Sequence, residues 1–374
     1  MKILNIKPKY IKRPIAKKMC NNKYLLRKYL LKYDLIGGRL GGASHSRLKI
    51  GIPKPLNVPF NMGKYTAYKQ IGSGTSGTVY KCCLTKIYTD YSDAYNKHQL
   101  DKENSDNKNF YNQQSKTVIL NTYAIKIMIS TKEIYDNEVS ILQRCNQSNL
   151  NNVIEYIESG FDTHYYYYII TKYYSNGELY KNISKLEMLI KVNVAIGICN
   201  GLKEIHAQNI IHRDIKPENI FLDNTNNPYI GDFGSAAIIS NGYIEDSYTG
   251  VTPNYSPPES VYRNDSNKYT WSEKSDIWSF GVMLYVILTS GELYKSITDV
   301  INHDNLIQNS INSTTFIDES DDINTLLQTL LINILKIKPD DRPTIEYIIS
   351  ELNVIKSQLL KLESEPEQKK QRTE

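Results

Sequence analysis

The sequence lacks any apolar run long enough to cross a bilayer. Its five cysteines form no C-x-x-C pair and leave an odd one over, so we expect neither a disulfide framework nor a zinc site. The start, Met1–Leu4, has no compact apolar core and no glycine at position two, so neither secretion nor myristoylation is expected. These absences predict an intracellular, cytoplasmic protein, with the nucleus as the alternative location.

Charge is unevenly distributed along the 374 residues. Residues 1–64 hold sixteen lysines and arginines against the single acid Asp34, whereas the rest holds 29 basic and 39 acidic residues. This basic arm is expected to bind an anionic membrane surface or the acidic body of its own chain, and a solvated extension is the alternative. Within it, apolar side chains share one arc of a helical wheel: Leu25, Leu26, Tyr29, Leu30 and Tyr33.

Composition predicts three zones. The basic extension and its Gly/Pro-rich linker cover 1–64, a globular body covers 65–353, and a charged tail covers 354–374. A polar run at about 86–115 shows no apolar periodicity and is interpreted as a disordered insertion. Strand-like alternation fills the first third of the body and helical patterns dominate after Lys185. No dedicated nucleic-acid-binding motif accompanies the basic arm, so binding of nucleic acid could only be an accessory function.

A glycine-rich segment with the form G-x-G-x-x-G-x-V opens the body. Glycines let backbone amides approach phosphate oxygens closely, but dinucleotide-binding folds share this spacing. The trailing valine and tyrosine favour a turn between two strands. The candidate nucleotide contacts here are Ile71, Gly72, Ser73, Gly74, Thr75, Ser76, Gly77 and Val79.

Downstream, Lys126 lies in an apolar strand, where a buried ammonium needs compensating charge. Glu138, on the amphipathic helix that follows, is the predicted partner, together with the phosphates of a nucleotide. A surface lysine on an edge strand is the alternative.

Two further runs carry the chemistry of phosphoryl transfer: HRDIKPEN at 212–219 and GDFG at 231–234. This reaction needs a carboxylate near the attacking hydroxyl, oxygen ligands for magnesium and positive charge near the moving phosphate. Asp214 suits the first role, Asn219 and Asp232 the second, and Lys216 with Lys126 the third.

With these motifs in order, residues 65–353 resemble a eukaryotic protein kinase catalytic domain. The resemblance implies an α+β bilobal fold, a small mainly β lobe with one regulatory helix and a larger helical lobe, with ATP and Mg²⁺ as cofactors. By resemblance Gly72, Gly74 and Gly77 cover the phosphates, while Lys126 contacts them and pairs with Glu138. Further ATP-binding positions implied by the family are Val79, Ala124 and Phe221 around the adenine, Thr171 as gatekeeper, Lys172 and Tyr174 in the hinge, and Glu178 near the ribose.

The resemblance also addresses substrate and regulation. Lys216 and Thr252 resemble the pattern of serine/threonine kinases, and Arg342 resembles the arginine that pairs with the activation-segment glutamate, here Glu259. Arg213 beside Asp214 implies a basic pocket that a phosphorylated activation loop neutralises. The candidate phosphorylation sites are Ser247, Tyr248 and Thr249, and a loop ordered without phosphate is the alternative.

We therefore expect an active protein serine/threonine kinase that uses protein substrates. The chief alternative is a pseudokinase or scaffold that binds ATP without efficient catalysis, although Lys126, Asp214, Asn219 and Asp232 are all present. A small-molecule kinase is a second alternative, which the segment ending at Glu259 argues against.

Overall fold

The structure, a computed structural model, describes most of the chain after residue 59. The described residues are 60–74, 77–84, 122–128, 130–162, 166–246, 252–260, 267–294, 300, 309–318 and 320–364. The chain divides into two compact units, a first unit of Met1–Asp136 with Ile157–Thr171 and a second unit of Asn137–Tyr156 with Lys172–Glu374. The predictions for the arm up to residue 59 and for the insertion at 86–115 lie outside the described residues.

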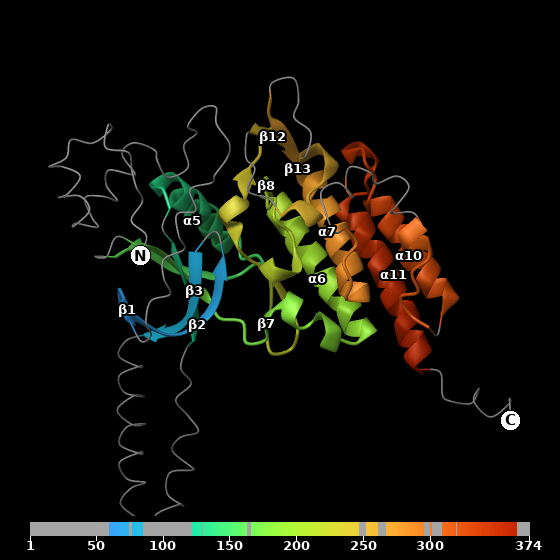
Figure 1. The fold of residues 1–374 in the computed structure, drawn as a ribbon, viewed down its shortest axis with the longest axis horizontal. Helices are drawn as coiled ribbons and strands as arrows, with labels where there is room; N and C mark the ends of the chain where they lie inside the picture. Colours follow the sequence, from blue (N-terminus) through green and yellow to red (C-terminus); the bar gives the residue numbers. More distant parts are fainter. Residues whose placement is uncertain are drawn as a thin grey trace, which may run out of the picture. The chain divides into compact units, whose positions relative to one another are not determined.

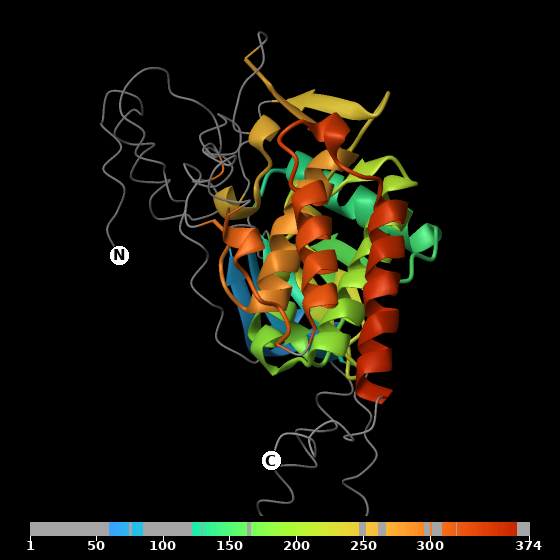
Figure 2. The same ribbon diagram turned by 90° about the vertical axis from the view of Figure 1, so that its right-hand side faces the viewer.

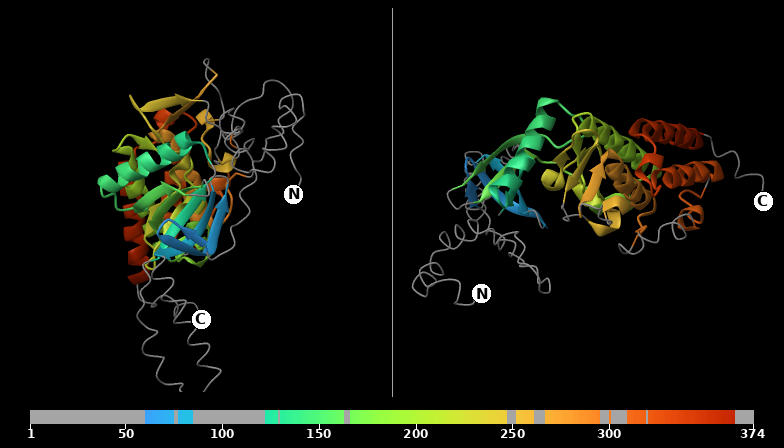
Figure 3. Two further views of the ribbon diagram at one scale, coloured as in Figure 1. Left: turned by 90° about the vertical axis from the view of Figure 1, so that its left-hand side faces the viewer. Right: turned by 90° about the horizontal axis from the view of Figure 1, so that it is seen from above.

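The first unit is built on a six-stranded sheet with the order β1-β2-β3-β4-β6-β5, drawn in blue to green in Figures 1 and 3. Its strands are β1 (Phe60–Met62), β2 (Tyr65–Gly74), β3 (Gly77–Leu84), β4 (Tyr123–Met128), β5 (Tyr156–Phe161) and β6 (Tyr167–Lys172). The helix α5 (Lys132–Gln147) follows β4 and continues from the first unit into the second. Its start is anchored where the ring of Tyr135 stacks on that of Tyr167, 4.4 Å between centroids.

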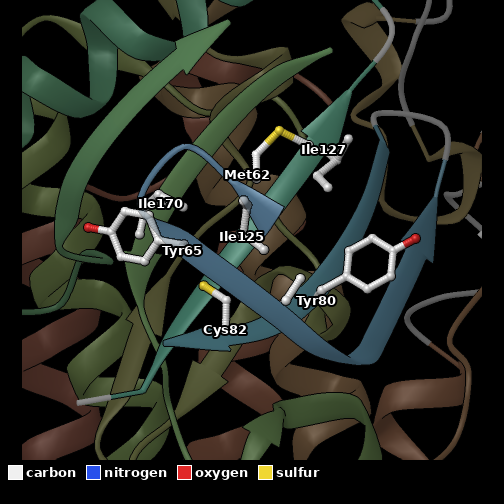
Figure 4. Packing of buried hydrophobic residues seen from close by; sticks show 8 residues of the cluster. Met62, Tyr65, Tyr80, Cys82, Ile125, Ile127 and Ile170 are labelled. Atoms are coloured by element: carbon white, nitrogen blue, oxygen red, sulfur yellow. The ribbon is translucent and has the colours of Figure 1, made fainter. Parts of the chain in front are cut away.

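The core of the first unit follows from strand alternation, because successive side chains of a strand point to opposite faces. Tyr80 and Cys82 of β3 and Ile125 and Ile127 of β4 are buried on one face, at 1% exposure or less. They form one hydrophobic cluster with Met62, Tyr65, Ala67 and Ile170 (Figure 4). Removal of this apolar area from water stabilises the sheet by about 25 cal/mol per Å².

The second unit is mainly helical. Its long helices are α6 (Met188–His206), α7 (Glu273–Thr289), α10 (Asp321–Ile334) and α11 (Ile345–Ser364), which lie side by side in Figures 1 and 2. Helix α7 is apolar on all sides and buried along most of its length, as expected for a central helix. It begins with a capping box in which Ser272 Oγ accepts from Lys274 N and Ser275 Oγ accepts from Ser272 N.

Short strands and 3₁₀ turns connect these helices. The strands form three small sheets: β10-β9-β7, β11-β8 and β12-β13. Their bounds are β7 (Gly177–Glu178), β8 (Ile210–Ile211), β9 (Ile220–Leu222), β10 (Pro228–Ile230), β11 (Ala237–Ile238), β12 (Tyr243–Asp246) and β13 (Tyr269–Ser272). The 3₁₀ helices are η2 (Leu179–Lys181), η3 (Ile183–Lys185), η4 (Pro217–Asn219), η5 (Phe233–Ser235), η6 (Pro253–Tyr255), η7 (Pro258–Ser260) and η8 (Pro339–Asp341). Residues 212–219, hereafter the catalytic loop, lie between β8 and β9.

The end of the globular body lies beyond the predicted boundary at Asn353, because that residue falls inside α11. The helix continues to Ser364 and buries Ile355 and Leu359 at 1% and 3% exposure. Of the predicted tail at 354–374, the first eleven residues, 354–364, therefore belong to this helix. Among the described helices, none combines the length and apolarity that a bilayer crossing requires.

Candidate active site

Asp214 is the centre of a closely bonded group in the second unit. Its Oδ2 accepts from Lys216 Nζ at 2.7 Å and from Asn219 Nδ2 at 3.0 Å, and its Oδ1 accepts from Thr252 Oγ1 at 2.7 Å. The Thr252 hydroxyl in turn accepts from Lys216 Nζ at 2.7 Å. The ammonium, the hydroxyl and the carboxylate thus form a closed triangle, in which charge-assisted bonds orient the carboxylate. The side chain of Asp214 is only 11% exposed.

The backbone of the catalytic loop is held by Asp276 of α7. This fully buried carboxylate accepts from His212 N and Arg213 N, each at 2.8 Å, and from His206 Nε2 at 2.9 Å. Burial alone would raise the pKa of Asp276, but the hydrogen bond and the charge of His206, together with the His212 amide, hold it below its ordinary value. We did not predict this residue as part of the site; a lone aspartate at the start of a buried apolar helix was the signal that could have found it.

Arg213 occupies a strained position, with φ +65°. Its Nε donates to Ser235 O at 2.6 Å, and its Nη1 donates to Asp246 Oδ2 at 2.5 Å. The guanidinium also lies over the ring of Trp271, 5.8 Å from the centroid. Asp246, at the end of β12, is a second residue that the sequence did not indicate.

The ring of His212 connects the catalytic loop to the segment around Asp232. Its Nδ1 accepts from Asp214 N at 3.3 Å, which leaves Nε2 to donate to Gly231 O at 3.0 Å. The ring meets Phe233 edge-on, with 5.0 Å between centroids.

The predicted metal ligands Asn219 and Asp232 lie on two backbone segments that are hydrogen-bonded to each other. Gly231 N donates to Asn219 O at 2.8 Å, so the residue before Asp232 is tied directly to Asn219. Asp232 has a left-handed backbone, φ +58° and ψ +73°, at the turn between β10 and η5. The amide nitrogen of Asn219 donates to Asp214 O and Oδ2, so the amide oxygen is the atom left to face a cation.

This donor set fits magnesium bound together with phosphates. Mg²⁺ in phosphoryl-transfer sites takes one or two protein oxygens and completes its shell with water and phosphate oxygens. The described residues hold no cluster of three or more His, Cys, Asp or Glu side chains of the kind that binds a metal without such help. One amide and one carboxylate are therefore the expected protein contribution.

The glycine-rich segment forms a hairpin between β2 and β3 in the first unit, as its trailing valine and tyrosine predicted. Gly72 pairs with Val79, Ser73 with Thr78 and Gly74 with Gly77. Thr75 and Ser76, at the tip, lie outside the described residues, and Ile71 precedes the paired glycines on β2.

The glycines at the two ends of the tip differ in their surroundings. Gly77 has φ +148°, and a Cβ there would lie 2.5 Å from Ile127 O, so the fold itself needs a glycine. A Cβ on Gly74 would meet nothing within 4 Å in the part of the chain that the structure describes. At Gly74, unlike Gly77, the missing side chain does not avoid a clash within the described hairpin. It leaves room beside the backbone of the hairpin.

Lys126 lies on an interior strand, since β4 is placed between β3 and β6. The edge-strand alternative is therefore wrong. Pairing of Val79 with Lys126 and of Lys81 with Ala124 places these four residues on the face opposite the buried cluster. Val79, Ala124 and Lys126, all predicted to contact a nucleotide, thus share one face of the sheet.

Glu138 of α5 is buried at 2% exposure and belongs to the second unit, whereas Lys126 belongs to the first. Their predicted pairing stays a prediction. Thr171 lies at the end of the first unit on β6.

The predicted hinge and ribose positions lie in the second unit. Lys172 N donates to Glu155 O at 3.0 Å, and its half-exposed ammonium lies 3.7 Å from Glu155 Oε2. Glu178 of β7 pairs across the ladder with Phe221 of β9, so the predicted ribose and adenine contacts are neighbours.

Tyr174 turns its side chain inward instead of presenting it to a ligand. It is 5% exposed, its ring lies against that of Tyr229 at 4.2 Å, and its hydroxyl accepts from Glu155 N at 3.1 Å. Burial raises the pKa of this phenol, which stays protonated. The prediction that Tyr174 binds a nucleotide can therefore concern only its backbone.

The end of the activation segment is anchored by the predicted pair of Arg342 and Glu259. The two guanidinium nitrogens Nη1 and Nη2 donate to Oε1 and Oε2 of Glu259, both at 2.8 Å, in a bidentate arrangement. Arg342 also donates to Lys336 O, Lys274 O and Ile337 O, and its guanidinium lies 4.9 Å from the ring centroid of Trp278. The candidate phosphorylation sites Ser247, Tyr248 and Thr249 lie outside the described residues.

The chain is similar in sequence to known protein kinases. A family model of the protein kinase domain matches residues 65–352. The serine/threonine-protein kinase shk2 of Schizosaccharomyces pombe is 32% identical over 165 residues, which cover 44% of this chain and 27% of the relative. The serine/threonine-protein kinase Nek1 of Mus musculus is 33% identical over 204 residues, 53% of this chain and 16% of the relative.

A third relative, the cell cycle serine/threonine-protein kinase CDC5/MSD2 of Saccharomyces cerevisiae, is 34% identical over 203 residues, 53% of this chain and 27% of the relative. The chain thus spans between 16% and 27% of the length of these curated relatives. The predicted α+β class, with a mainly β unit and a helical unit, is confirmed. Because the family model covers most of the sequence, the chain belongs to the protein kinase domain family.

Proposed function

We propose that this chain transfers the γ-phosphate of ATP to serine or threonine hydroxyls of protein substrates. The observation that carries the proposal is the triangle of Asp214, Lys216 and Thr252, with three separations of 2.7 Å. Phosphoryl transfer depends mainly on positioning and on charge stabilisation, and this group supplies both at one place.

Each member of the triangle takes a separate role. Asp214 accepts a hydrogen bond from the attacking hydroxyl and orients it. Lys216 offsets negative charge on the transferred group, and Thr252 holds the ammonium and the carboxylate in register. The Lys216–Thr252 bond supports a serine/threonine substrate, because it ties the activation segment to the loop in the pattern on which the sequence prediction rested.

The nucleotide is proposed to bind where the sheet face of Val79, Ala124 and Lys126 supplies apolar area and one cation. The backbone of the hairpin covers its phosphates, and the open space at Gly74 supports close approach. Asn219 and Asp232 are proposed to hold Mg²⁺, which when bound neutralises charge on the phosphate oxygens. Lys126 with Glu138, and Phe221 with Glu178, complete the proposed ATP contacts.

The decisive experiment measures phosphate transfer from labelled ATP to casein by the purified chain and by Asp214→Asn. We expect the variant to lose transfer by about a hundredfold or more, while nucleotide binding is retained. Asp322→Asn, at an exposed position of α10, removes the same charge outside the site and is the matched control. Equal transfer by wild type and Asp214→Asn would contradict the assigned role.

A pseudokinase is the alternative that the same experiment separates. It would bind ATP and give no transfer in the wild type under any magnesium concentration. The bonded triangle favours the active kinase, because a scaffold does not need its carboxylate oriented by two side chains at once.

A further inference from the structure

Arg213 lies next to Asp214 in sequence, so its position affects the carboxylate directly. Its side chain is 7% exposed, and a buried guanidinium is stable only when charge and hydrogen bonds compensate for lost water. Asp276 holds its backbone amide, while Ser235 O and Asp246 Oδ2 hold its side chain. Its left-handed backbone is therefore maintained by contacts from outside the catalytic loop.

Asp246 is the negatively charged partner of Arg213, and the two-stranded β12–β13 sheet holds it in place. Asp246 pairs with Tyr269 at the end of the β12–β13 ladder, and Ile244 pairs with Trp271 two positions earlier. Ile244 and Tyr269 pack on a small core of Ile211, Ala237, Ile239 and Trp271. Strand β12 is therefore held by its pairing with β13 and by packing on this core, and both contacts fix the position of Asp246 beside Arg213.

The position of Asp246 in the sequence relates the Arg213–Asp246 pair to the candidate phosphorylation sites. It immediately precedes Ser247, Tyr248 and Thr249, the residues whose phosphorylation was predicted to neutralise Arg213. The Asp246 carboxylate, which already accepts from Arg213 Nη1 at 2.5 Å, fills the role that such a phosphate would take. Unlike a phosphate group, this negative charge is part of the chain itself and does not have to be added by another kinase.

We propose that Asp246 is a positioning residue, which acts through Arg213 to hold Asp214 ready for catalysis without phosphorylation of the activation segment. This inference rests on the proposed kinase activity. It replaces the predicted phosphate-dependent pocket with a pocket closed by the chain's own carboxylate.

The test uses the full chain with Ser247→Ala, Tyr248→Phe and Thr249→Ala combined, treated with phosphatase and checked by mass spectrometry. We expect this background protein to keep kcat within about threefold of the untreated wild type. Adding Asp246→Asn should lower kcat about tenfold or more and leave the binding constant of an ATP analogue within about twofold. Adding Asp246→Glu instead should restore most of the lost kcat, which a merely structural role would not predict.

Glu245→Gln is the matched control, because Glu245 is the adjacent carboxylate of β12 and alternates to the other side of the strand. It should change kcat less than twofold by the same comparison. Combining Asp246→Asn with Arg213→Gln should cost little more than Arg213→Gln alone, since the proposed effect of the Asp246 carboxylate passes through the guanidinium. Additive losses would overturn the proposal.

The outcomes separate this inference from the proposed function. If wild type transfers no phosphate before or after phosphatase treatment, the kinase activity itself fails. If wild type is active but the phosphatase-treated background protein is not, activation requires phosphate and the role of Asp246 is overturned. Should Asp246→Asn fail to fold, judged by circular dichroism, the Glu variant and the phosphate-free background protein still decide.

Discussion

Asp276 shows how one buried carboxylate can control a site that it does not enter. It receives hydrogen bonds from two consecutive backbone amides and one imidazole, and these bonds stabilise the strained turn at Arg213. Strain at a non-glycine residue with positive φ costs on the order of 1–3 kcal/mol, so the turn needs such support. We therefore expect the turn to relax when the carboxylate is lost.

Asp276→Asn is predicted to lower the free energy of unfolding by about 3–5 kcal/mol at neutral pH, because it leaves buried donors without their charged acceptor. The pKa of Asp276 lies below its ordinary 3.8, so its contribution is present above that pH and is lost as pH falls through the lower folded pKa. Denaturant titrations from pH 7 into the acid range should show the difference between wild type and variant shrinking at low pH. A difference independent of pH would contradict this account.

At the scale of elements, the β2–β3 hairpin contains two glycines with different structural roles. Gly77 is needed by the backbone, whereas a Cβ on Gly74 would contact none of the described residues. The same distinction could not be made from the sequence, since both positions match the motif equally well.

Gly77→Ala is predicted to destabilise the first unit by about 1–3 kcal/mol, because its Cβ would meet a carbonyl oxygen at 2.5 Å on a strand that cannot move freely. Gly74→Ala should leave the melting temperature unchanged. Thermal unfolding of the two variants beside wild type measures this directly. Equal melting temperatures for Gly77→Ala and Gly74→Ala would show that the hairpin adjusts to the added methyl group.

Much of the site could be predicted because phosphoryl transfer concentrates its groups in short motifs. Asp214, Lys216 and Asn219 lie within six residues, and in the structure Thr252 is hydrogen-bonded to Asp214 and Lys216. Asp246 and Asp276 could not be assigned in the same way, since their roles depend on strand pairing and helix packing between distant segments.

Helix α11 illustrates a missed pattern. Its buried residues Ile345, Ile348, Leu352, Ile355 and Leu359 follow a spacing of three and four that continues past Asn353. The surrounding lysines and glutamates hid this stripe, because composition averages over all faces of a helix whereas burial concerns one.

At the scale of the whole molecule, charge is divided between the basic extension and the acidic remainder. We propose that residues 1–59 bind an anionic lipid surface through this charge, with docking on the body as the other outcome of a test. Such binding must weaken as salt screens it, over a distance of about 10 Å at 0.1 M ionic strength.

The full chain should sediment with phosphatidylserine-containing vesicles and release at high salt, whereas a chain starting at residue 60 should not bind. Starting there keeps β1, which pairs with β2 and belongs to the sheet. Pure phosphatidylcholine vesicles are the control surface. Equal sedimentation of both chains would remove the lipid proposal.

The two arginine anchors have a further consequence, because each lies against one of the only two tryptophans in the sequence. Trp271 reports on the Arg213 environment and Trp278 on that of Arg342. The tryptophan fluorescence of the unlabelled protein is therefore the sum of two emitters, one beside each arginine. A Trp271→Phe substitution would leave a single emitter beside Arg342 and Glu259.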